Sequence, residues 1–212
     1  MMNYILENLK KHFTLKEQSV GEFQKVKAKG MTFTIHQYEA IGLGNVSVME
    51  ARGFFGLMKM DTLIINPSQK DLPLFSYDRI FAMGNDTLII ELYDTLLGEY
   101  DASGMKAVKE AYAQLPERDP GSHWYDNIKL KESISKKGKK AQTAAFDELT
   151  KKYFAAYLAG VDKAGDCDMV EKKKKASVYV EGLLENGGPS TDVFKKEFGE
   201  EKTAHLFRKI LF

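Results

Sequence analysis

The chain has 212 residues, of which 43% are hydrophobic and 29% charged, and its formal net charge is +1. This near-neutral balance excludes a global electrostatic attraction to nucleic acid or to membranes, so any such attraction has to come from a local patch. The single cysteine excludes an internal disulfide framework and is typical of a reducing compartment.

The N-terminal half of the chain passes from helix to strands. Residues 1–30 mix apolar and polar residues at helical spacing and predict one or two helices, the first of them amphipathic and unlike a signal peptide. Residues 31–97 are strand-like: MTFTIHQYEA alternates, and Gly84-Asn85-Asp86 stands where a hairpin turn belongs. Because no helical segment between these strands is long enough for a crossover, we expect an antiparallel meander.

The C-terminal half returns to helix. Helical periodicity runs through residues 105–115 and 144–158, PERDPGSHWYDNIKL between them reads as a loop that leads into a short strand, and Ser190 or Thr191 is a plausible N-cap for a later helix. No apolar run approaches the ~20 residues of a membrane span. We therefore predict one cytoplasmic domain, residues 1–212, whose antiparallel β-sheet is flanked by helices on both faces as an α/β/α sandwich.

Two motifs that could carry chemistry fail on inspection. Gly42 and Gly44 suggest a dinucleotide fingerprint, but Ser47 stands where its third glycine belongs and a strand follows instead of a helix. The four histidines are never at metal-ligand spacing from one another or from Cys167. We read AGDCDMVEKKKK, which contains Cys167 and the lysine run at 172–175, as a charged loop. We expect no metal site and no nucleophilic cysteine.

Three polar features of the sequence could still serve a functional site. Strand alternation puts Glu50 on one face with Val46, Val48 and Arg52, where the carboxylate either faces water beside Arg52 or lines a cavity. Asp78 closes the apolar segment DLPLFSYD, where it either caps a turn or serves a site. The lysine clusters at 136–140 and 172–175 are either solvated surface or a docking patch for an acidic partner.

Five segments together resemble one protein family. They are MEARGFF, DTLIINP, DLPLFSYD, PGSHWYDNI and the tail VFKKEFGEEKTAHLFRKILF. They resemble the ferredoxin-dependent bilin reductases, in which a glutamate on one strand precedes a strand that ends in proline and a D-L-P-[LM]-F-x-x-D segment. The family glutamate falls on Glu50, the proline on Pro67 and the last aspartate on Asp78, while Trp124 matches a Pro-x-Trp segment. The resemblance runs in patches from residue 45 to the end.

This resemblance implies a reaction and its acids. The family holds a linear tetrapyrrole such as biliverdin between the sheet and the C-terminal helices, without a tightly bound cofactor. Electrons come singly, by a radical mechanism, from reduced ferredoxin or flavodoxin, and the protein supplies protons. We accordingly expect Asp78 to donate a proton to the pigment and Glu50 to be the second donor or relay, because burial raises the pKa of a carboxyl and lets it act as a general acid.

The resemblance also implies binding residues. Thr62 is expected to hydrogen-bond a pyrrole or a water, and Arg52 and Arg79 are expected to bind the propionates of the pigment. An acidic electron donor is expected to dock on the lysine clusters, with the contacts on Lys136, Lys137, Lys139, Lys140, Lys172 and Lys173.

The sequence departs from the family at two places that bear on function. Thr62 stands where some members carry a pocket histidine, and Gly187 and Gly188 stand where several members carry an Asn-Asp pair. Two alternatives therefore stay open beside an active reductase: a tetrapyrrole-binding or carrier protein with the same fold and no catalysis, and an α/β domain with an unrelated ligand.

Overall fold

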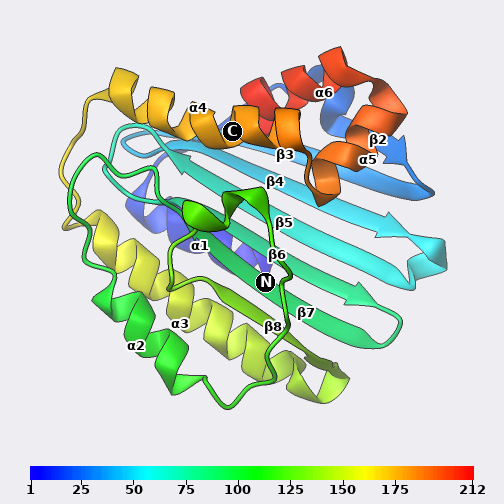
Figure 1. Cartoon of the computed structure of the whole chain (residues 1–212), viewed down its shortest axis with the longest axis horizontal. Helices are drawn as coiled ribbons and strands as arrows, with labels where there is room; N and C mark the ends of the chain where they lie inside the picture. The colour runs from blue at the N-terminus through cyan, green and yellow to red at the C-terminus, as the bar shows by residue number, and fades with distance from the viewer.

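A computed structural model of the chain (Figure 1) describes residues 1–188 and 190–212. Within these residues, eight strands form one antiparallel sheet in the order β1-β3-β4-β5-β6-β7-β8, and β2 pairs with β3 beside β1. The strands are β1 (Leu15–Gln18), β2 (Lys25–Ala28), β3 (Met31–Ala40), β4 (Gly44–Gly53), β5 (Met58–Pro67), β6 (Leu74–Ala82), β7 (Asn85–Tyr93) and β8 (Ile134–Lys139). The five central strands β3 to β7 are the predicted meander.

Short turns join these strands and make the sheet antiparallel. The β6–β7 hairpin turns at Met83 and Gly84, which have φ of 50° and 73°, the left-handed conformation that two-residue hairpin loops require. The predicted turn is therefore present one residue earlier than expected, because Asn85 and Asp86 already belong to the β7 ladder.

The first face of the sheet is covered by helices α1 (Met2–His12), α2 (Ser103–Ala111) and α3 (Thr143–Val161). Strand residues on this face and helix residues such as Ile5, Leu9, Phe146 and Tyr153 share one buried cluster. The strand residues of this cluster include Val46, Val48, Leu63, Phe75, Tyr77, Leu88 and Ile90. Because side chains alternate along a strand, this assignment decides which residues point to the opposite face.

The second face is covered by α4 (Met169–Asn186), α5 (Pro189–Phe198), α6 (Glu200–Leu206) and the π-helical turn η5 (Phe207–Leu211). These elements pack on Phe33, Ile35, Met49 and Ile64 in a second buried cluster. Short 3₁₀ turns complete the chain at η1 (Gly21–Gln24), η2 (Phe54–Gly56), η3 (Trp124–Asn127) and η4 (Lys140–Gln142). Helices cover both faces, so the predicted α/β/α sandwich is confirmed.

Local predictions fail at three places where tertiary contacts override the local pattern. Residues 1–30 form one helix followed by β1 and β2, which pair with β3. The lysine run at 172–175 lies on helix α4, not in a loop. The N-cap of α5 is Gly188, instead of Ser190 or Thr191.

Candidate functional site

A cavity of about 240 Å³ lies on the second face of the sheet, between β4–β7 and the C-terminal helices. Its floor is made by strand side chains, among them Met49, Thr62, Asp78 and Glu91. Its roof comes from the loop before η3, from η3 itself, from α4 and α5, and from the chain's end at Phe212. The cavity therefore lies where the resemblance placed the pigment, between the sheet and the C-terminal helices.

Asp78 on β6 lies opposite Thr62 on β5 in the sheet, and both line the cavity. The Thr62 hydroxyl donates a hydrogen bond of 2.5 Å to Oδ1 of Asp78. Burial raises the pKa of Asp78 to about 6, the Thr62 hydrogen bond works against this rise, and the charge of Glu91 adds to it. A carboxyl with this pKa is protonated often enough near neutral pH to act as a general acid.

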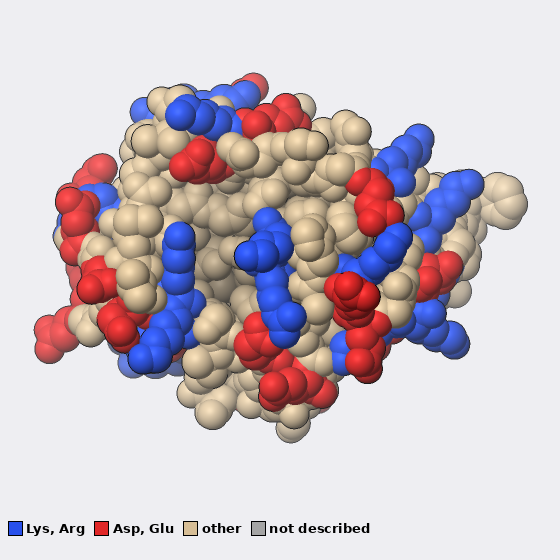
Figure 2. All heavy atoms as spheres, turned by 90° about the horizontal axis from the view of Figure 1, so that it is seen from above, with Lys and Arg blue, Asp and Glu red and all other residues tan. Residues whose placement is uncertain are grey.

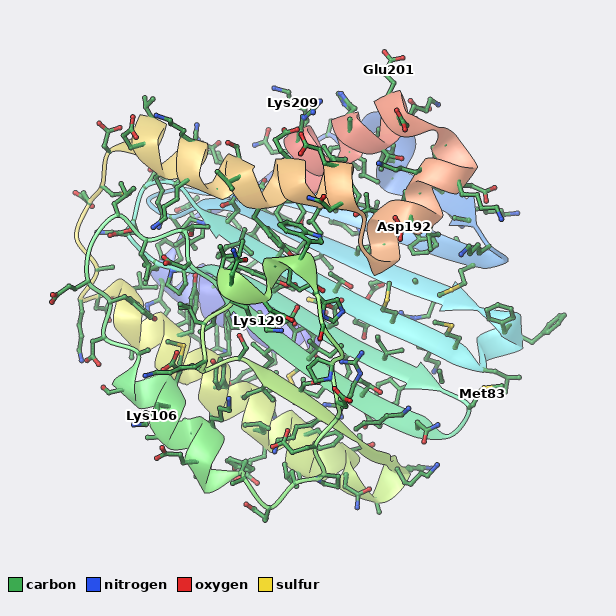
Figure 3. The ribbon with its side chains drawn as sticks, viewed as in Figure 1. Met83, Lys106, Lys129, Asp192, Glu201 and Lys209 are labelled. Atoms are coloured by element: carbon green, nitrogen blue, oxygen red, sulfur yellow. The ribbon has the colours of Figure 1, made fainter. Side chains whose placement is uncertain are left out.

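Glu91 is a second carboxyl in the cavity, and it was not predicted. It lies on β7, where the Tyr93 hydroxyl donates a hydrogen bond of 2.6 Å to its Oε2. Lys129, which Figure 3 labels on the loop in front of the sheet, has its Nζ 3.7 Å from Glu91 and 2.6 Å from Asp126. The sequence held a signal for this residue, because Glu91 alternates with Ile89 and Tyr93 on one face of an otherwise apolar strand.

Aromatic side chains form one wall of the cavity. The rings of Tyr93 and Tyr179 stack with centroids 4.0 Å apart, and Tyr125 meets Tyr93 edge-on at 5.7 Å. Flat, rigid rings of this kind suit a planar conjugated ligand, because stacking and edge contacts add to the gain from apolar burial.

Trp124 anchors this wall to α4. Its indole Nε1 donates a hydrogen bond of 3.0 Å to the carbonyl of Gly187. The indole also lies so close to α4 that a β-carbon built at Gly182 would be 2.2 Å from the ring. Gly182 is therefore the position that lets the η3 turn pack on α4 and close the roof.

An arginine also lines the cavity, and it was not predicted either. Arg118, in the loop before η3, lines the cavity together with His123. Its Nη1 donates a hydrogen bond of 3.2 Å to the hydroxyl of Ser135. The guanidinium keeps further donors, which can bind a carboxylate in a planar fork.

Glu50 does not share a cavity with Asp78, so the predicted convergence of these two carboxyls is wrong. Glu50 lies opposite Asp61 in the ladder, on the face of Val46 and Val48, whereas Asp78 is on the other face. Near the end of β4 it is half-buried, and the Arg52 guanidinium lies 3.6 Å from Glu50 and 2.6 Å from Asp61. The predicted alternation is correct, because Glu50 shares a face with Val46 and Val48. That face, however, is covered by α1 and α3 and does not line the cavity.

Arg52 and Arg79 are not at the cavity either, which corrects the predicted propionate ligands. Arg52 forms the surface ion pairs just described. Arg79 is buried on the first face, where its Nε lies 2.6 Å from Asp86 and its guanidinium lies 5.1 Å from the Phe146 ring centroid. A buried arginine that is already paired with a carboxylate holds the core together.

The predicted docking lysines divide into buried and exposed ones. The Nζ of Lys136 bonds the Leu115 carbonyl and Glu117, and the Nζ of Lys172 bonds Asp71 and two backbone carbonyls. Both side chains are buried, so neither is free to meet a partner. The exposed members are Lys137, Lys139, Lys140 and Lys173. Over helices α4–α6 the basic side chains are interspersed with acidic ones (Figure 2).

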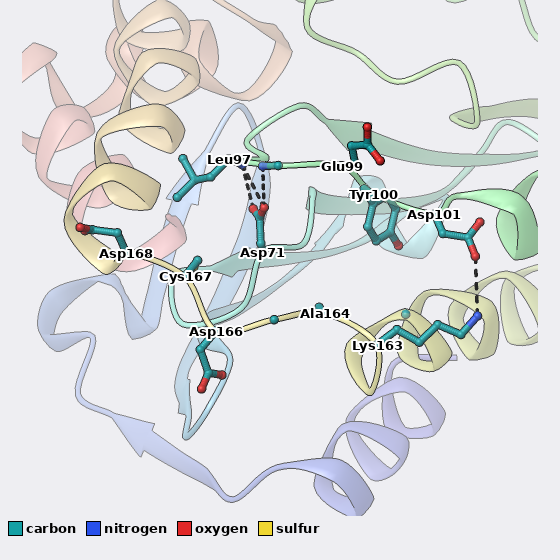
Figure 4. Close-up of a pocket in the computed structure, with 13 residues that line it drawn as sticks. Asp71, Leu97, Glu99, Tyr100, Asp101, Lys163, Ala164, Asp166, Cys167 and Asp168 are labelled. Carbon is teal, nitrogen blue, oxygen red and sulfur yellow. Dashed lines mark hydrogen bonds and ion pairs between the residues drawn. The ribbon is translucent and has the colours of Figure 1, made fainter.

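A second hollow of about 700 Å³ lies away from Asp78, on the surface beside Asp71, Lys163 and Asp166 (Figure 4). Two of its acidic groups form ion pairs: Nζ of Lys163 lies 3.6 Å from Asp101, and Nζ of Lys70 lies 2.8 Å from Asp166. Partial burial opposes ionisation of Asp71, but hydrogen bonds from Leu97 and Lys172 hold its pKa below the ordinary value. The first aspartate of DLPLFSYD is therefore a structural link, and the last one faces the cavity.

In residues 1–188 and 190–212, no three His, Cys, Asp or Glu side chains gather as a metal site would need. In the same part of the chain, no helix is long and apolar enough to cross a membrane.

The sequence matches no family model and no curated protein. The structure, however, is similar to that of phytochromobilin synthase from tomato in complex with biliverdin, with a TM-score of 0.80. The alignment covers 99% of this chain and 80% of that chain, at 15% sequence identity. The two proteins share a fold. At this identity the likeness to phytochromobilin synthase concerns the fold alone, and the chemistry has to be argued from the residues of this cavity.

Proposed function

We propose that residues 1–212 form a single domain that binds a linear tetrapyrrole in the cavity beside Asp78 and reduces it, with electrons from ferredoxin or flavodoxin. One observation carries this proposal: a buried aspartic acid with a pKa of about 6 lines the cavity. The fold, shared with a protein crystallised with biliverdin, supports the choice of ligand.

In this proposal Asp78 is the proton donor. Reduction of one double bond of the pigment takes up two electrons, delivered singly by the donor protein, and two protons. Asp78 in its protonated form gives the first proton to a pyrrole or lactam atom, takes up a proton from solvent, and gives the second proton after the second electron has arrived. Thr62 holds the carboxyl in one orientation by its 2.5 Å hydrogen bond, and the nearby negative charge of Glu91 favours the protonated form of Asp78.

The remaining wall would hold the pigment in place. Tyr93, Tyr125 and Tyr179 provide flat apolar surface for the conjugated rings. Arg118 takes the place of Arg52 and Arg79 as the proposed propionate ligand, because it lines the cavity and keeps donors to spare. The exposed lysines Lys137, Lys139, Lys140 and Lys173 remain the proposed contacts of an acidic electron donor.

The size of the cavity implies a movement on binding. Its volume of about 240 Å³ is below the roughly 300–1,000 Å³ of ordinary small-molecule sites. A four-ring pigment would therefore have to displace part of the roof or leave some rings in solvent. The loop at Pro120 to His123 carries little regular structure and is the part of the roof we expect to shift.

A carrier without catalysis is the second candidate function. Gly188 lines the cavity wall without a side chain that could donate a proton, and Thr62 is not an acid at neutral pH. A protein with Asp78 as a lone donor could hold the pigment without turning it over. Reaction with a reduced electron donor separates the two functions.

A spectral titration with biliverdin tests the proposal. Binding should shift and sharpen the pigment's absorption band, and reduced ferredoxin should then bleach or blue-shift that band. Asp78→Asn should abolish turnover while leaving the binding shift, because the amide keeps the shape but cannot donate an acidic proton. If biliverdin binds and the reduced donor changes nothing, the protein is a carrier. If no spectral shift develops at any pigment concentration, both functions are wrong.

A further inference from the structure

One edge of the sheet gathers hairpin tips that are far apart in the sequence. The antiparallel ladders end at the pairs Ala28↔Met31, Gly53↔Met58 and Ala82↔Asn85, and Asn85 is in turn paired with Lys139. The β2–β3, β4–β5 and β6–β7 hairpins and the end of β8 therefore lie side by side at this edge. Met83, labelled in Figure 3, marks it.

The centre of this edge is apolar and exposed. The β4–β5 tip carries Phe54, Phe55 and Leu57, which are 52%, 109% and 72% exposed, and Met83 on the next tip is 92% exposed. Large apolar side chains on loop tips are normally turned onto the core, and a contiguous exposed group of them marks an interaction surface. Phe55 extends fully into solvent.

The backbone of this tip holds its aromatic residues outward. Phe54 and Phe55 both have positive φ, 52° and 55°, in the left-handed region that residues with a β-carbon rarely adopt. Neither phenylalanine belongs to the two buried clusters of the described residues, and both side chains are more than half exposed. The left-handed backbone therefore presents two aromatic side chains to the outside of the chain.

Exposed lysines flank the apolar tip on both sides. They are Lys27, Lys29, Lys59, Lys137, Lys139 and Lys140. Among the described residues none of these lysines forms an ion pair, and Lys139 bonds only the Asn85 amide oxygen. The acids of this edge are already engaged, since Arg52 pairs with Asp61 and Arg79 pairs with Asp86. In a chain of net charge +1, this edge is a local basic patch.

We propose that this edge docks on the surface of an anionic lipid bilayer, with Phe54, Phe55 and Leu57 inserted among the headgroups. Basic residues around an apolar tip match a negatively charged membrane surface, where each lysine adds attraction, and Phe and Leu side chains are among those that bury at the headgroup boundary. The apolar part of this edge is limited to four exposed side chains on two hairpin tips, whereas a stable protein interface buries roughly 800 Å² of each partner. Pigment binding in the cavity does not depend on this docking, but Lys137, Lys139 and Lys140 are also proposed contacts of the electron donor, so the donor and the bilayer would compete for these three lysines.

Co-sedimentation with vesicles tests the proposal. The full chain should sediment with vesicles of equal parts phosphatidylserine and phosphatidylcholine, remain in solution with phosphatidylcholine alone, and dissociate at high salt. The double variant Phe54→Asn/Phe55→Asn should lower the partition coefficient about tenfold or more. Asparagine tolerates the left-handed conformation, so this variant keeps the hairpin fold. Lys27→Gln/Lys29→Gln should weaken binding and reduce its salt dependence.

Matched controls replace exposed residues of the same kinds elsewhere. Val178→Gln removes an apolar side chain on α4 that is 63% exposed, and Lys10→Gln/Lys11→Gln removes two exposed lysines on α1. Neither should change the partition coefficient. A Phe55→Trp variant should show a blue-shifted emission relative to the Trp124 background only with the anionic vesicles.

Three results would overturn the proposal. The folded chain fails to sediment with anionic vesicles, or Phe54→Asn/Phe55→Asn binds them as well as the unaltered chain. The third result is that the full chain binds no vesicles, while Phe54→Asn/Phe55→Asn or Lys27→Gln/Lys29→Gln weakens its complex with a soluble acidic protein such as ferredoxin. This result would assign the edge to a protein partner. Biliverdin titration of the same variants is a separate measurement, so failure of the docking and failure of the cavity function are distinguishable.

Discussion

Thr62 and Asp78 face each other across the β5–β6 ladder, and the threonine hydroxyl donates to the aspartate at 2.5 Å. Two opposed effects meet at this carboxyl. Burial favours its neutral form, while the hydrogen bond favours its charged form. The balance leaves a pKa of about 6, and each neighbour of Asp78 becomes a means of moving that value in a known direction.

Thr62→Val should raise the pKa of Asp78, because it removes the hydrogen bond that favours the carboxylate. A hydrogen bond to a charged group contributes ~1.5–3 kcal/mol, which corresponds to a rise of roughly one pH unit or more. Infrared titration of the protonated carboxyl band measures it. Ser76→Ala, which alters the same cavity floor without removing a bond to Asp78, is the control. An unchanged titration midpoint in Thr62→Val would mean that this hydrogen bond has no effect on the pKa of Asp78.

Glu91→Gln should lower the pKa of Asp78. The glutamine removes a negative charge that raises the pKa of Asp78, and it keeps an acceptor for the Tyr93 hydroxyl. We expect the midpoint to fall by a few tenths of a unit up to about one unit. Glu110→Gln, on the exposed surface of α2, should leave it in place. A rise in Glu91→Gln would contradict the electrostatic role of Glu91.

Asp78→Asn should change how stability depends on pH. The pKa of Asp78 rises from 3.8 to about 6 on folding, so between these values the folded state binds more protons than the unfolded state. Stability therefore falls as pH rises through this window and stays reduced above it. The variant should lack this fall and gain on the order of 2–3 kcal/mol at neutral pH. Urea denaturation at several pH values measures both effects, and parallel curves for the two proteins would argue against a raised pKa.

Gly182→Ala should loosen the roof of the cavity. The added β-carbon would lie 2.2 Å from the Trp124 ring, so the indole has to move, at a cost of ~1–3 kcal/mol. Gly104→Ala on α2 is the matched control, because its nearest contact is 3.7 Å and helix propensity alone should stabilise it by ~0.5–1 kcal/mol. Thermal unfolding should give opposite signs for the two variants, and only Gly182→Ala should alter biliverdin affinity.

Lys172→Met should destabilise the fold. The ammonium is fully buried between Asp71 and the carbonyls of Leu72 and Thr95, and removal of one partner of a buried pair costs ~3–5 kcal/mol. The neighbouring Lys173 is exposed, so Lys173→Gln should stay within ~0.5 kcal/mol of the unaltered chain. Any effect of Lys172→Met on electron delivery should disappear when rates are compared at equal folded fraction.

Much of the fold could be predicted because its signals are local. Alternation in MTFTIHQYEA and the turn before Asn85 predict paired strands, and a hairpin needs contacts only between neighbours in the sequence. β8 and α4 were not placed correctly, because their lysine-rich sequences gave no clear apolar stripe. In both elements a buried lysine is bonded to a residue from another part of the chain: Lys136 to Glu117, and Lys172 to Asp71.

The site could be predicted only in part, and the reason lies in the period of a strand. Alternation states which residues share a face, as Val46, Val48 and Glu50 do, but not which face meets the cavity. Glu50 and Asp78 were each placed on a strand, and register then put them on opposite sides of the sheet. Alternation and register likewise place Glu91 on the same face of the sheet as Asp78.

By itself the sequence determined an antiparallel sheet with helices around it, and it singled out the aspartate at the end of DLPLFSYD. Only the tertiary structure decided which carboxyls meet, which lysines are buried, and that three hairpin tips and the end of β8 form one edge with exposed apolar and basic side chains. Local patterns carry no information about distant partners. The pKa, the ion pairs and the exposure of a charged side chain depend on the residues that the packed elements place around it.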